Sequence, residues 1–186
     1  MHPNKLLNFF YKKKIRFFSG VPDSCTSSLS NTLLRSKNKR FTHIIAPNEG
    51  TAVSLGVGHY LSTSQIPCIY MQNSGFGNAT DPITNLCHET VYKIPLLILI
   101  GWRGKPGLKD EPQHVTQGKK ICTTLKSYGI KFFDSKKIDL KKSAIGMVLK
   151  SGNVKDSVAV AKKLKKKGLK STEIGRALSQ GNWEAY

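Results

Sequence analysis

The chain has 186 residues, of which 39% are hydrophobic, and its 30 Lys and Arg residues outnumber its 11 Asp and Glu residues to give a formal net charge of +19. This length is typical of one globular domain with a core and is short for two domains. No apolar run reaches the roughly 18 residues that a bilayer-spanning helix needs, so we expect no transmembrane helix and no membrane partner. The first residues lead into an amphipathic helix without the apolar core of a signal peptide, and we therefore expect a cytoplasmic protein.

The positive charge comes mainly from lysine runs, at residues 12–14, 136–137, 141–142 and between 162 and 170. Surfaces that read nucleic-acid sequence usually carry arginine forks and stacking aromatic rings, which these runs lack. We interpret the runs as solvated faces and expect no nucleic-acid partner, with non-specific polyanion binding as the alternative. The four cysteines form no C-x-x-C pair and have no histidine at metal spacing, so we expect reduced thiols and no metal site in this chain.

Strand-like and helix-like segments alternate along the chain. The pattern predicts helices over residues 5–14, 24–34, 50–60, 79–92 and 115–128, and strands over 16–19, 42–46, 67–71, 95–100, 130–133 and 144–149. Such alternation is typical of an α/β fold, here a three-layer sandwich with a mostly parallel sheet covered by helices on both faces. We expect residues 1–150 to form this domain and the Lys-rich residues 151–186 to form a tail or an arm against a partner.

Three polar loops, at residues 20–24, 47–50 and 72–78, each follow the carboxyl end of a predicted strand. In a parallel sheet these ends share one rim, which is where ligands bind. Glu49 is a lone carboxylate in the middle loop, between an expected buried strand and a helix of small residues whose glycines permit close approach. We interpret Glu49 as the chemical centre of the chain. The alternative is a glutamate that only complements the dipole of the helix.

Two further segments have the composition of ligand-binding loops. The turn at residues 73–78 resembles a phosphate cradle at a helix N-terminus but matches no nucleotide-binding motif, so a purely structural turn is the alternative. The long loop at 101–114 contains Arg103, Lys105 and Lys109, which suit an anion, and His114, which suits proton transfer. An exposed loop histidine without a catalytic role is the alternative for His114.

Five motifs in register connect these loops to a known family: GVPDS at 20–24, PNEG at 47–50, YMQNSG at 70–75, IGWRG at 100–104 and DEPQHV at 110–115. Together they closely resemble the N-terminal, pyrimidine-binding part of thiamine-diphosphate-dependent 2-oxoacid decarboxylases of the phosphonopyruvate decarboxylase family. The sulfopyruvate decarboxylase α subunit is the nearest relative, with a weaker match to the motifs. The resemblance covers residues 6–150.

The resemblance implies a thiamine diphosphate cofactor and a set of site residues. Glu49 would hydrogen-bond the ring nitrogen N1′ of the aminopyrimidine and so promote removal of the thiazolium C2 proton. Asp23 and His114 would move protons around the substrate carbonyl. The resemblance further implies cofactor contacts from Pro22, Asn73, Ser74 and Gly75, and substrate contacts from Ser24, Gln117 and Arg103.

Enzymes of this kind also need a domain with a Gly-Asp-Gly motif that holds Mg²⁺ and the diphosphate, and no Gly-Asp-Gly occurs in this chain. We therefore expect a diphosphate-binding subunit or second domain in trans, in a hetero- or homo-oligomer, and no turnover by this chain alone. The reaction implied is decarboxylation of 3-phosphonopyruvate to phosphonoacetaldehyde and CO2 in phosphonate biosynthesis. Two alternatives stay open: a sulfopyruvate decarboxylase α subunit, and a truncated, non-catalytic domain whose basic tail binds polyanions.

Overall fold

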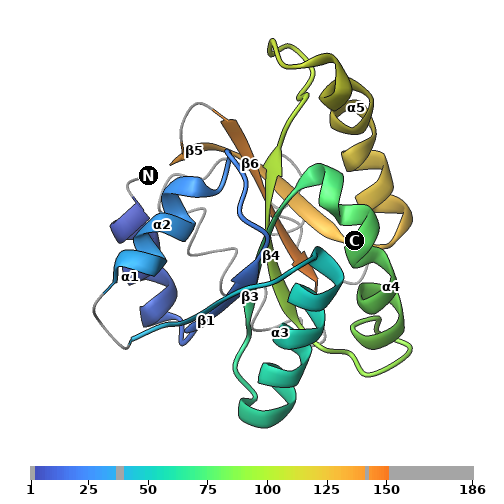
Figure 1. Ribbon diagram of the computed structural model, residues 1–186. Coiled ribbons are helices and arrows are strands. Elements are labelled where there is room, and N and C mark those ends of the chain that lie inside the picture. The colour runs from blue at the N-terminus through green and yellow to red at the C-terminus, as the bar shows by residue number, and fades with distance from the viewer. Residues whose placement is uncertain (1–2, 37–39, 141–142, 151–186) are drawn as a thin grey trace, which may run out of the picture.

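The computed structural model describes residues 3–36, 40–140 and 143–150 (Figure 1). The expected Lys-rich tail at 151–186 lies outside the described residues. None of the helices in the described part of the chain combines the length and the hydropathy needed to cross a bilayer.

One six-stranded sheet, with the strand order β2-β1-β3-β4-β6-β5, forms the centre of the molecule. Strand β1 pairs in parallel with β2 and β3, and β3 pairs in parallel with β4, whereas β6 runs antiparallel to both β4 and β5. The expected mostly parallel sheet is thus confirmed, and the last strand pair is the antiparallel part. The strands are β1 (Phe17–Gly20), β2 (Thr42–Ile45), β3 (Cys68–Gln72), β4 (Leu96–Trp102), β5 (Lys131–Leu140) and β6 (Ser143–Lys150).

Helices cover both faces of the sheet, so the three-layer prediction is also confirmed. Helices α1 and α2 lie on one face, and α3, α4 and α5 lie on the other (Figure 1). Because alternate strand residues point to opposite faces, Tyr70 packs with the first pair of helices and its neighbours Ile69 and Met71 pack with the second group. The helices are α1 (Pro3–Lys12), α2 (Ser27–Arg35), α3 (Glu49–Thr63), α4 (Phe76–Leu86) and α5 (Pro112–Ser127), and a 3₁₀ turn, η1 (Asn73–Gly75), precedes α4.

Residues 42–45 form a strand, as predicted, but the prediction that this strand is buried is wrong. Strand β2 is at the edge of the sheet and pairs only with β1, so Ile44 and Ile45 remain 37% and 49% exposed. Only His43 points inward, where its Nε2 lies 2.8 Å from the hydroxyl oxygen of Tyr70. An apolar run indicates a strand but does not say which neighbours the strand will have.

Two predicted helix limits also differ from the structure. Helix α4 ends at Leu86, six residues before the expected end, and the chain then runs through turns that leave Tyr92 exposed. Helix α5 starts at Pro112, because proline at the first helical position needs no hydrogen-bond acceptor and already has a helical φ. His114 consequently lies in the first turn of a helix and not in a loop.

Candidate functional site

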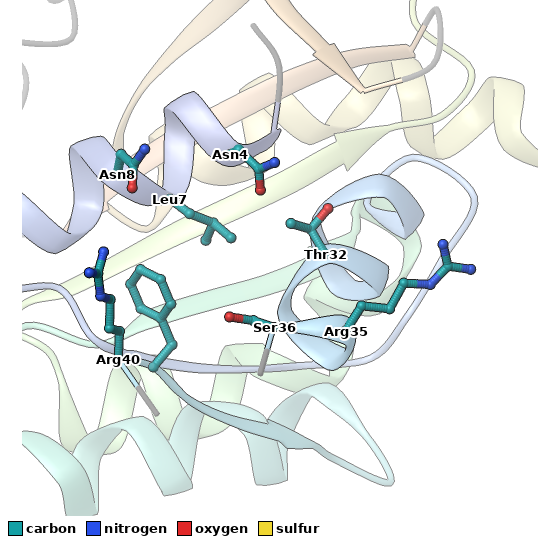
Figure 2. A pocket seen from close by; sticks show the side chains of 8 residues that line it. Asn4, Leu7, Asn8, Thr32, Arg35, Ser36 and Arg40 are labelled. Carbon is teal, nitrogen blue, oxygen red and sulfur yellow. The ribbon is translucent and has the colours of Figure 1, made fainter. Parts of the chain in front are cut away.

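The loops that follow β1, β2 and β3 meet at one rim of the sheet, as the sequence predicts, and the loop that follows β4 joins them there. These four strands are mutually parallel, so their carboxyl ends face the same way. The pocket of about 310 Å³ in Figure 2 lies elsewhere, between α1, α2 and the residues that enter β2. Its lining includes Arg35 and Phe41, which lie at the amino ends of the strands and away from the rim. The rim is therefore the place to look for the chemistry.

Glu49 begins helix α3 at this rim, and only 9% of its surface is exposed. Asn48 caps the helix, with its Oδ1 accepting a 2.8 Å hydrogen bond from the backbone N–H of Thr51. The Glu49 Oε2 atom accepts a 2.9 Å hydrogen bond from Asn78 Nδ2 in α4. Its Oε1 atom accepts none from the residues that the structure describes. The site thus contains a buried carboxylate with one oxygen held and one oxygen open.

Glycines bring the carboxylate and the neighbouring helix together. A methyl group on Gly75 would lie 2.0 Å from Glu49 Oε1 and 2.3 Å from its Cδ, and one on Gly50 would lie 2.9 Å from the carbonyl oxygen of Asn78. Real side chains do not tolerate such approaches, so the carboxylate fits only because these positions have no side chain. The expected role of glycine beside Glu49 is confirmed as a packing requirement.

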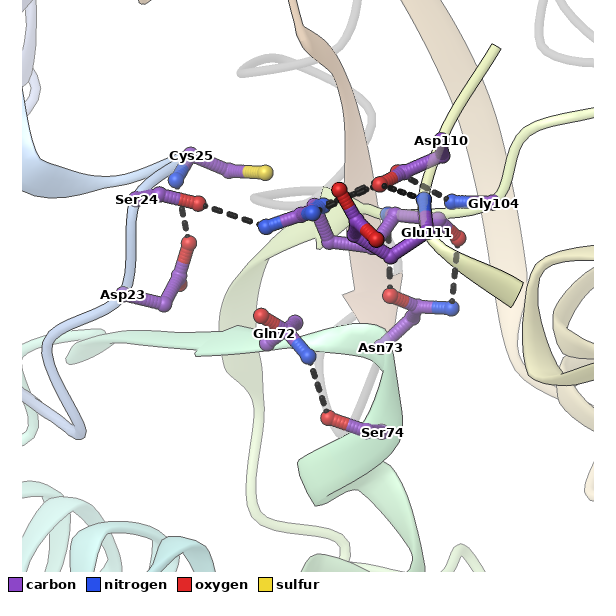
Figure 3. Close-up of polar contacts among 10 residues, drawn as sticks. Asp23, Ser24, Cys25, Gln72, Asn73, Ser74, Gly104, Asp110 and Glu111 are labelled. Atoms are coloured by element: carbon purple, nitrogen blue, oxygen red, sulfur yellow. Dashed lines mark hydrogen bonds and ion pairs between the residues drawn. The ribbon is translucent and has the colours of Figure 1, made fainter. Parts of the chain in front are cut away.

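A second polar group surrounds Arg103, directly after β4, and Figure 3 labels its members Ser24, Asn73 and Asp110. Arg103 Nε donates to Asp110 Oδ2 and Oδ1 at 2.9 and 3.1 Å, and Nη2 donates to Oδ1 at 2.6 Å. On its other side, Nη1 donates to Ser24 Oγ at 2.9 Å. The hydrogen bonds from Arg103 hold the pKa of Asp110 far below its ordinary value, and the same contact raises the pKa of Arg103. Both groups are charged throughout the physiological range.

The backbone of Arg103 is held by Asn73, which is 5% exposed. Asn73 Nδ2 donates to the carbonyl oxygen of Arg103 at 3.0 Å, and Arg103 N donates to Asn73 Oδ1 at 2.9 Å (Figure 3). This pair of bonds extends the β3–β4 ladder beyond its last register pair, Gln72 with Gly101. The Asn73 amide therefore sets the position of Arg103.

Asp23 fixes the turn that follows β1. Its carboxylate accepts hydrogen bonds from the backbone N–H groups of Cys25 and Thr26, and from Thr26 Oγ1 at 2.9 Å. The expectation that the second helix begins at residue 24 is wrong, because this turn comes first and α2 begins at Ser27 with Thr26 as its N-cap. The turn lies against β4, since a methyl group on Gly101 would be 2.5 Å from Cys25 Cβ and 3.2 Å from Asp23 Oδ1.

Sequence comparison identifies the fold that holds these groups. The family model described as "Thiamine pyrophosphate enzyme, N-terminal TPP binding domain" matches residues 6–126. The chain belongs to this family. The matched segment contains both the Glu49 group and the Arg103 group.

Curated relatives match parts of the chain. A phosphonopyruvate decarboxylase from Streptomyces hygroscopicus is 38% identical over 101 residues, which are 54% of this chain and 24% of the relative. A sulfopyruvate decarboxylase subunit alpha from Methanococcus maripaludis is 31% identical over 125 residues, which are 67% of this chain and 71% of the relative. The chain thus spans about a quarter of the first relative and 71% of the second.

A solved structure from Mycobacterium smegmatis, described as that of a thiamin diphosphate-dependent enzyme, superposes with a TM-score of 0.45 at 20% sequence identity. The match covers 61% of this chain and 22% of that chain. A similarity of this size carries no conclusion beyond the family match.

For the remaining predicted site residues of this thiamine pyrophosphate domain, the contacts in the structure do not test the predicted roles. Pro22, Ser24 and Gln117 are exposed, and Ser74 accepts a 2.6 Å hydrogen bond from Gln72 Nε2. His114 is half-buried, and its side chain makes no hydrogen bond to the described residues. Its backbone packs on Gly104, which has φ +65° and where a methyl group would lie 2.0 Å from the His114 carbonyl oxygen. The cofactor, substrate and proton-transfer roles of these residues stay predictions.

Two residues of the rim, Asp110 and Asn78, were not predicted as site residues, although both lie within or beside the motifs. Asp110 holds Arg103, and Asn78 holds Glu49. Asp110 could have been found as the first acidic residue after Arg103 in a loop rich in cations. Asn78 could have been found from the turn at 73–78, which places a polar side chain at the start of the helix beside Glu49. Among the described residues, no group of three or more His, Cys, Asp or Glu side chains could hold a metal ion.

Proposed function

We propose that this chain is the pyrimidine-binding half of a thiamine-diphosphate-dependent 2-oxoacid decarboxylase. The reaction is the decarboxylation of 3-phosphonopyruvate to phosphonoacetaldehyde and CO2, in phosphonate biosynthesis, and residues 1–150 form the pyrimidine-binding domain. One observation supports this function above the others. At the rim of a thiamine pyrophosphate domain, Glu49 keeps one carboxylate oxygen open in a glycine-lined, mostly buried position.

The open oxygen of Glu49 fits the aminopyrimidine of the cofactor. A buried carboxylate needs hydrogen-bond donors, and Asn78 supplies only one, to Oε2. A ring N–H facing Oε1 would satisfy the other oxygen and would let Glu49 hold or release a proton there. The bound cofactor supplies an electron sink for the carbanion that the loss of CO2 leaves. Pro22, Asn73, Ser74 and Gly75 would line the cofactor site, and Asp23 and His114 would move protons near the substrate carbonyl.

The substrate preference rests on the Arg103 side of the rim. Arg103 faces the first rim loop through Ser24, and Lys105 places its Nζ 4.8 Å from the centre of the Trp102 ring. With Gln117, these groups favour a 2-oxoacid that carries a second acidic group. The similarity to phosphonopyruvate decarboxylase favours a phosphonate, and the broad coverage of the sulfopyruvate decarboxylase subunit alpha makes a sulfonate the second candidate.

A partner completes the site in this proposal. Mg²⁺ and the diphosphate would be held by a second subunit or domain, because the described residues contain no acidic cluster for a metal. The relatives named as alpha subunits favour a second subunit, in a hetero- or homo-oligomer.

The test is an assay of CO2 release with thiamine diphosphate and Mg²⁺. The chain is purified with and without the protein encoded next to it, and each sample receives phosphonopyruvate or sulfopyruvate. We expect CO2 only from the mixture, with kcat/KM at least about tenfold higher for phosphonopyruvate, which is about 1.4 kcal/mol of discrimination. A higher kcat/KM for sulfopyruvate would establish the second candidate. No CO2 and no stabilisation by the cofactor in either sample would refute a decarboxylase and leave the polyanion-binding alternative.

A further inference from the structure

Both the backbone and the guanidinium group of Arg103 are held by hydrogen bonds, although its side chain reaches solvent. Its partner Asp110 has no assigned role. We propose that Asp110 is a positioning residue that aims Arg103, together with the hydroxyl of Ser24, at the tetrahedral oxyanion on the distal end of the substrate. This proposal rests on the proposed function for its substrate, and names the side-chain group that would recognise it.

Hydrogen bonds hold the backbone on both sides of Arg103. Asn73 holds its N–H and its carbonyl group with two side-chain hydrogen bonds. On the C-terminal side, Gly104 donates its N–H to Asp110 Oδ2 at 2.7 Å. Trp102 Nε1 donates to the carbonyl oxygen of Gly118 at 2.8 Å, which ties this segment to helix α5. The backbone from which the guanidinium group projects is therefore held in place.

The guanidinium is then oriented by Asp110. Both carboxylate oxygens contact it, in the bidentate arrangement that gives an arginine–carboxylate pair its directional strength. The same oxygens accept from the backbone N–H groups of Gly104 and Glu111, at 2.7 and 2.8 Å. Asp110 is thus saturated with donors, and its charge is used within the protein. It orients another group and does not itself bind the substrate.

Donors remain after these contacts are made. An arginine side chain has five N–H groups, and its hydrogen bonds within the described part of the chain use Nε–H, one N–H on Nη1 and one on Nη2. One N–H on Nη1 and one on Nη2 are left. Ser24 Oγ accepts from Arg103, so its own proton is left for another acceptor. Three donors from two different rim loops therefore lie together, which suits an oxyanion with several oxygens.

The location and the exposure fit this use. The side chain of Arg103 is 22% exposed, so a small ligand can reach it. Asp23 is another carboxylate near Arg103 that would repel an anion, but its oxygens accept three hydrogen bonds from Cys25 and Thr26. Because Asp110 balances the charge of Arg103, the group recognises its ligand through directed N–H and O–H bonds more than through net charge. A tetrahedral phosphonate or sulfonate matches such a cradle better than a lone carboxylate does.

The first test uses the full chain alone, labelled with ¹⁵N, and follows the Nε–H signal of Arg103 by NMR, assigned through Arg103→Lys. Phosphonoacetate, sulfoacetate and acetate are titrated separately. We expect the two tetrahedral oxyanions to shift the signal at millimolar concentration and acetate to leave it in place. Asp110→Asn keeps the size of the side chain, and we expect it to weaken binding of the better oxyanion by at least about tenfold. Asp81→Asn, which makes the same charge change on the exposed face of α4, is the control and should bind as the wild type does.

Two results would overturn the proposal: no shift of the Arg103 signal with either oxyanion, or equal affinity in wild type and Asp110→Asn. If Asp110→Asn fails to fold, Ser24→Ala removes one donor of the cradle from an exposed position, and unchanged affinity in that variant overturns the proposal as well. The relative affinities of phosphonoacetate and sulfoacetate identify which oxyanion the cradle prefers.

A second test in the assembled enzyme separates this inference from the proposed function. We expect Asp110→Asn to raise KM for phosphonopyruvate at least about tenfold while kcat/KM for pyruvate, which has no distal anion, changes less than about threefold. Equal losses for both substrates would contradict the oxyanion role of Asp110 while leaving the decarboxylase intact. Absence of any decarboxylation, with oxyanion binding to Arg103 retained, would refute the proposed function and leave the cradle standing.

Discussion

On the Glu49 side of the rim, glycines leave the space that the carboxylate fills, whereas on the Arg103 side hydrogen bonds fix the positions of the side chains. Beside Glu49, the space is set by Gly75 and Gly50, and Asn78 is the one described residue whose side chain makes a polar contact with the carboxylate. Around Arg103, Asn73 holds the backbone, and Asp110 and Ser24 hold the guanidinium group. The first arrangement leaves an acceptor open beside a close-fitting wall, which suits a flat ring. The second leaves several donors open in a fixed direction, which suits an anion.

The largest effect in this comparison is expected from Glu49→Gln. Glutamine keeps the size and the hydrogen bond from Asn78 but cannot exchange a proton at the open oxygen. We predict that decarboxylation by the assembled enzyme falls by about 10²- to 10⁴-fold, the usual range for losing a proton-transfer group. The thermal unfolding midpoint of the chain should change little. Activity within about threefold of the wild type would contradict the central role of Glu49.

The next effect tests the wall beside Glu49. In Gly75→Ala, the new methyl group would occupy the position of the Glu49 carboxylate, so the carboxylate must move. We expect activity to fall by at least about tenfold, since small displacements of reacting groups are costly. Gly77→Ala, in the adjoining helix α4, is a matched control because nothing lies within 4 Å of the added methyl group, and alanine there should keep activity and slightly stabilise the chain. Similar activities for the two variants would show that the close fit has no chemical role.

These two predictions rest on features that the sequence already indicated. The polar loops after successive strands located the rim, and PNEG singled out Glu49, because strand direction and glycine positions are local properties of the chain. The hydrogen-bond partners of Arg103 were harder to predict from the sequence. Its partners depend on how a loop folds back over seven residues, and on which backbone groups the Asn73 amide reaches. The exposure of β2 was missed for a similar reason, since the neighbours of a strand are set by distant parts of the chain.

A smaller effect is expected on stability from the Arg103 side. Asn73→Ala removes both side-chain hydrogen bonds to the backbone of Arg103, so the Arg103 carbonyl oxygen loses the donor from Asn73, while the Arg103 N–H keeps only its 3.2 Å contact with the carbonyl oxygen of Gly101. We expect the free energy of unfolding to fall by about 1–3 kcal/mol, measured by urea denaturation. Asn85→Ala, which removes an exposed hydrogen bond to Asp81 on α4, should cost less than about 0.5 kcal/mol. Equal losses from the two variants would mean that Asn73 does not hold the rim together.

The smallest effect concerns the buried Tyr70, whose hydroxyl oxygen lies 2.8 Å from Nε2 of the half-buried His43. Burial, with the nearby Cys68 and Asp23, raises the pKa of Tyr70 to about 12. Between pH 10 and 12 the unfolded chain loses this proton while the folded chain keeps it, so stability declines with rising pH across that interval. In Tyr70→Phe this part of the decline should disappear from unfolding midpoints measured against pH. Tyr92→Phe, which changes an exposed tyrosine, should keep the wild-type slope, and a wild-type slope in Tyr70→Phe would contradict the assignment.

The most direct measurement of the central claim follows the cofactor before any substrate is added. In the assembled complex with thiamine diphosphate and Mg²⁺, exchange of the cofactor C2 proton for deuterium is timed by rapid quenching in D2O and proton NMR. We predict fast exchange with the wild-type chain and with Asp81→Asn, and exchange slower by at least about a hundredfold with Glu49→Gln. Exchange that is equally fast with Glu49→Gln would show that the proton at C2 leaves without this carboxylate and would contradict the proposed role of the rim.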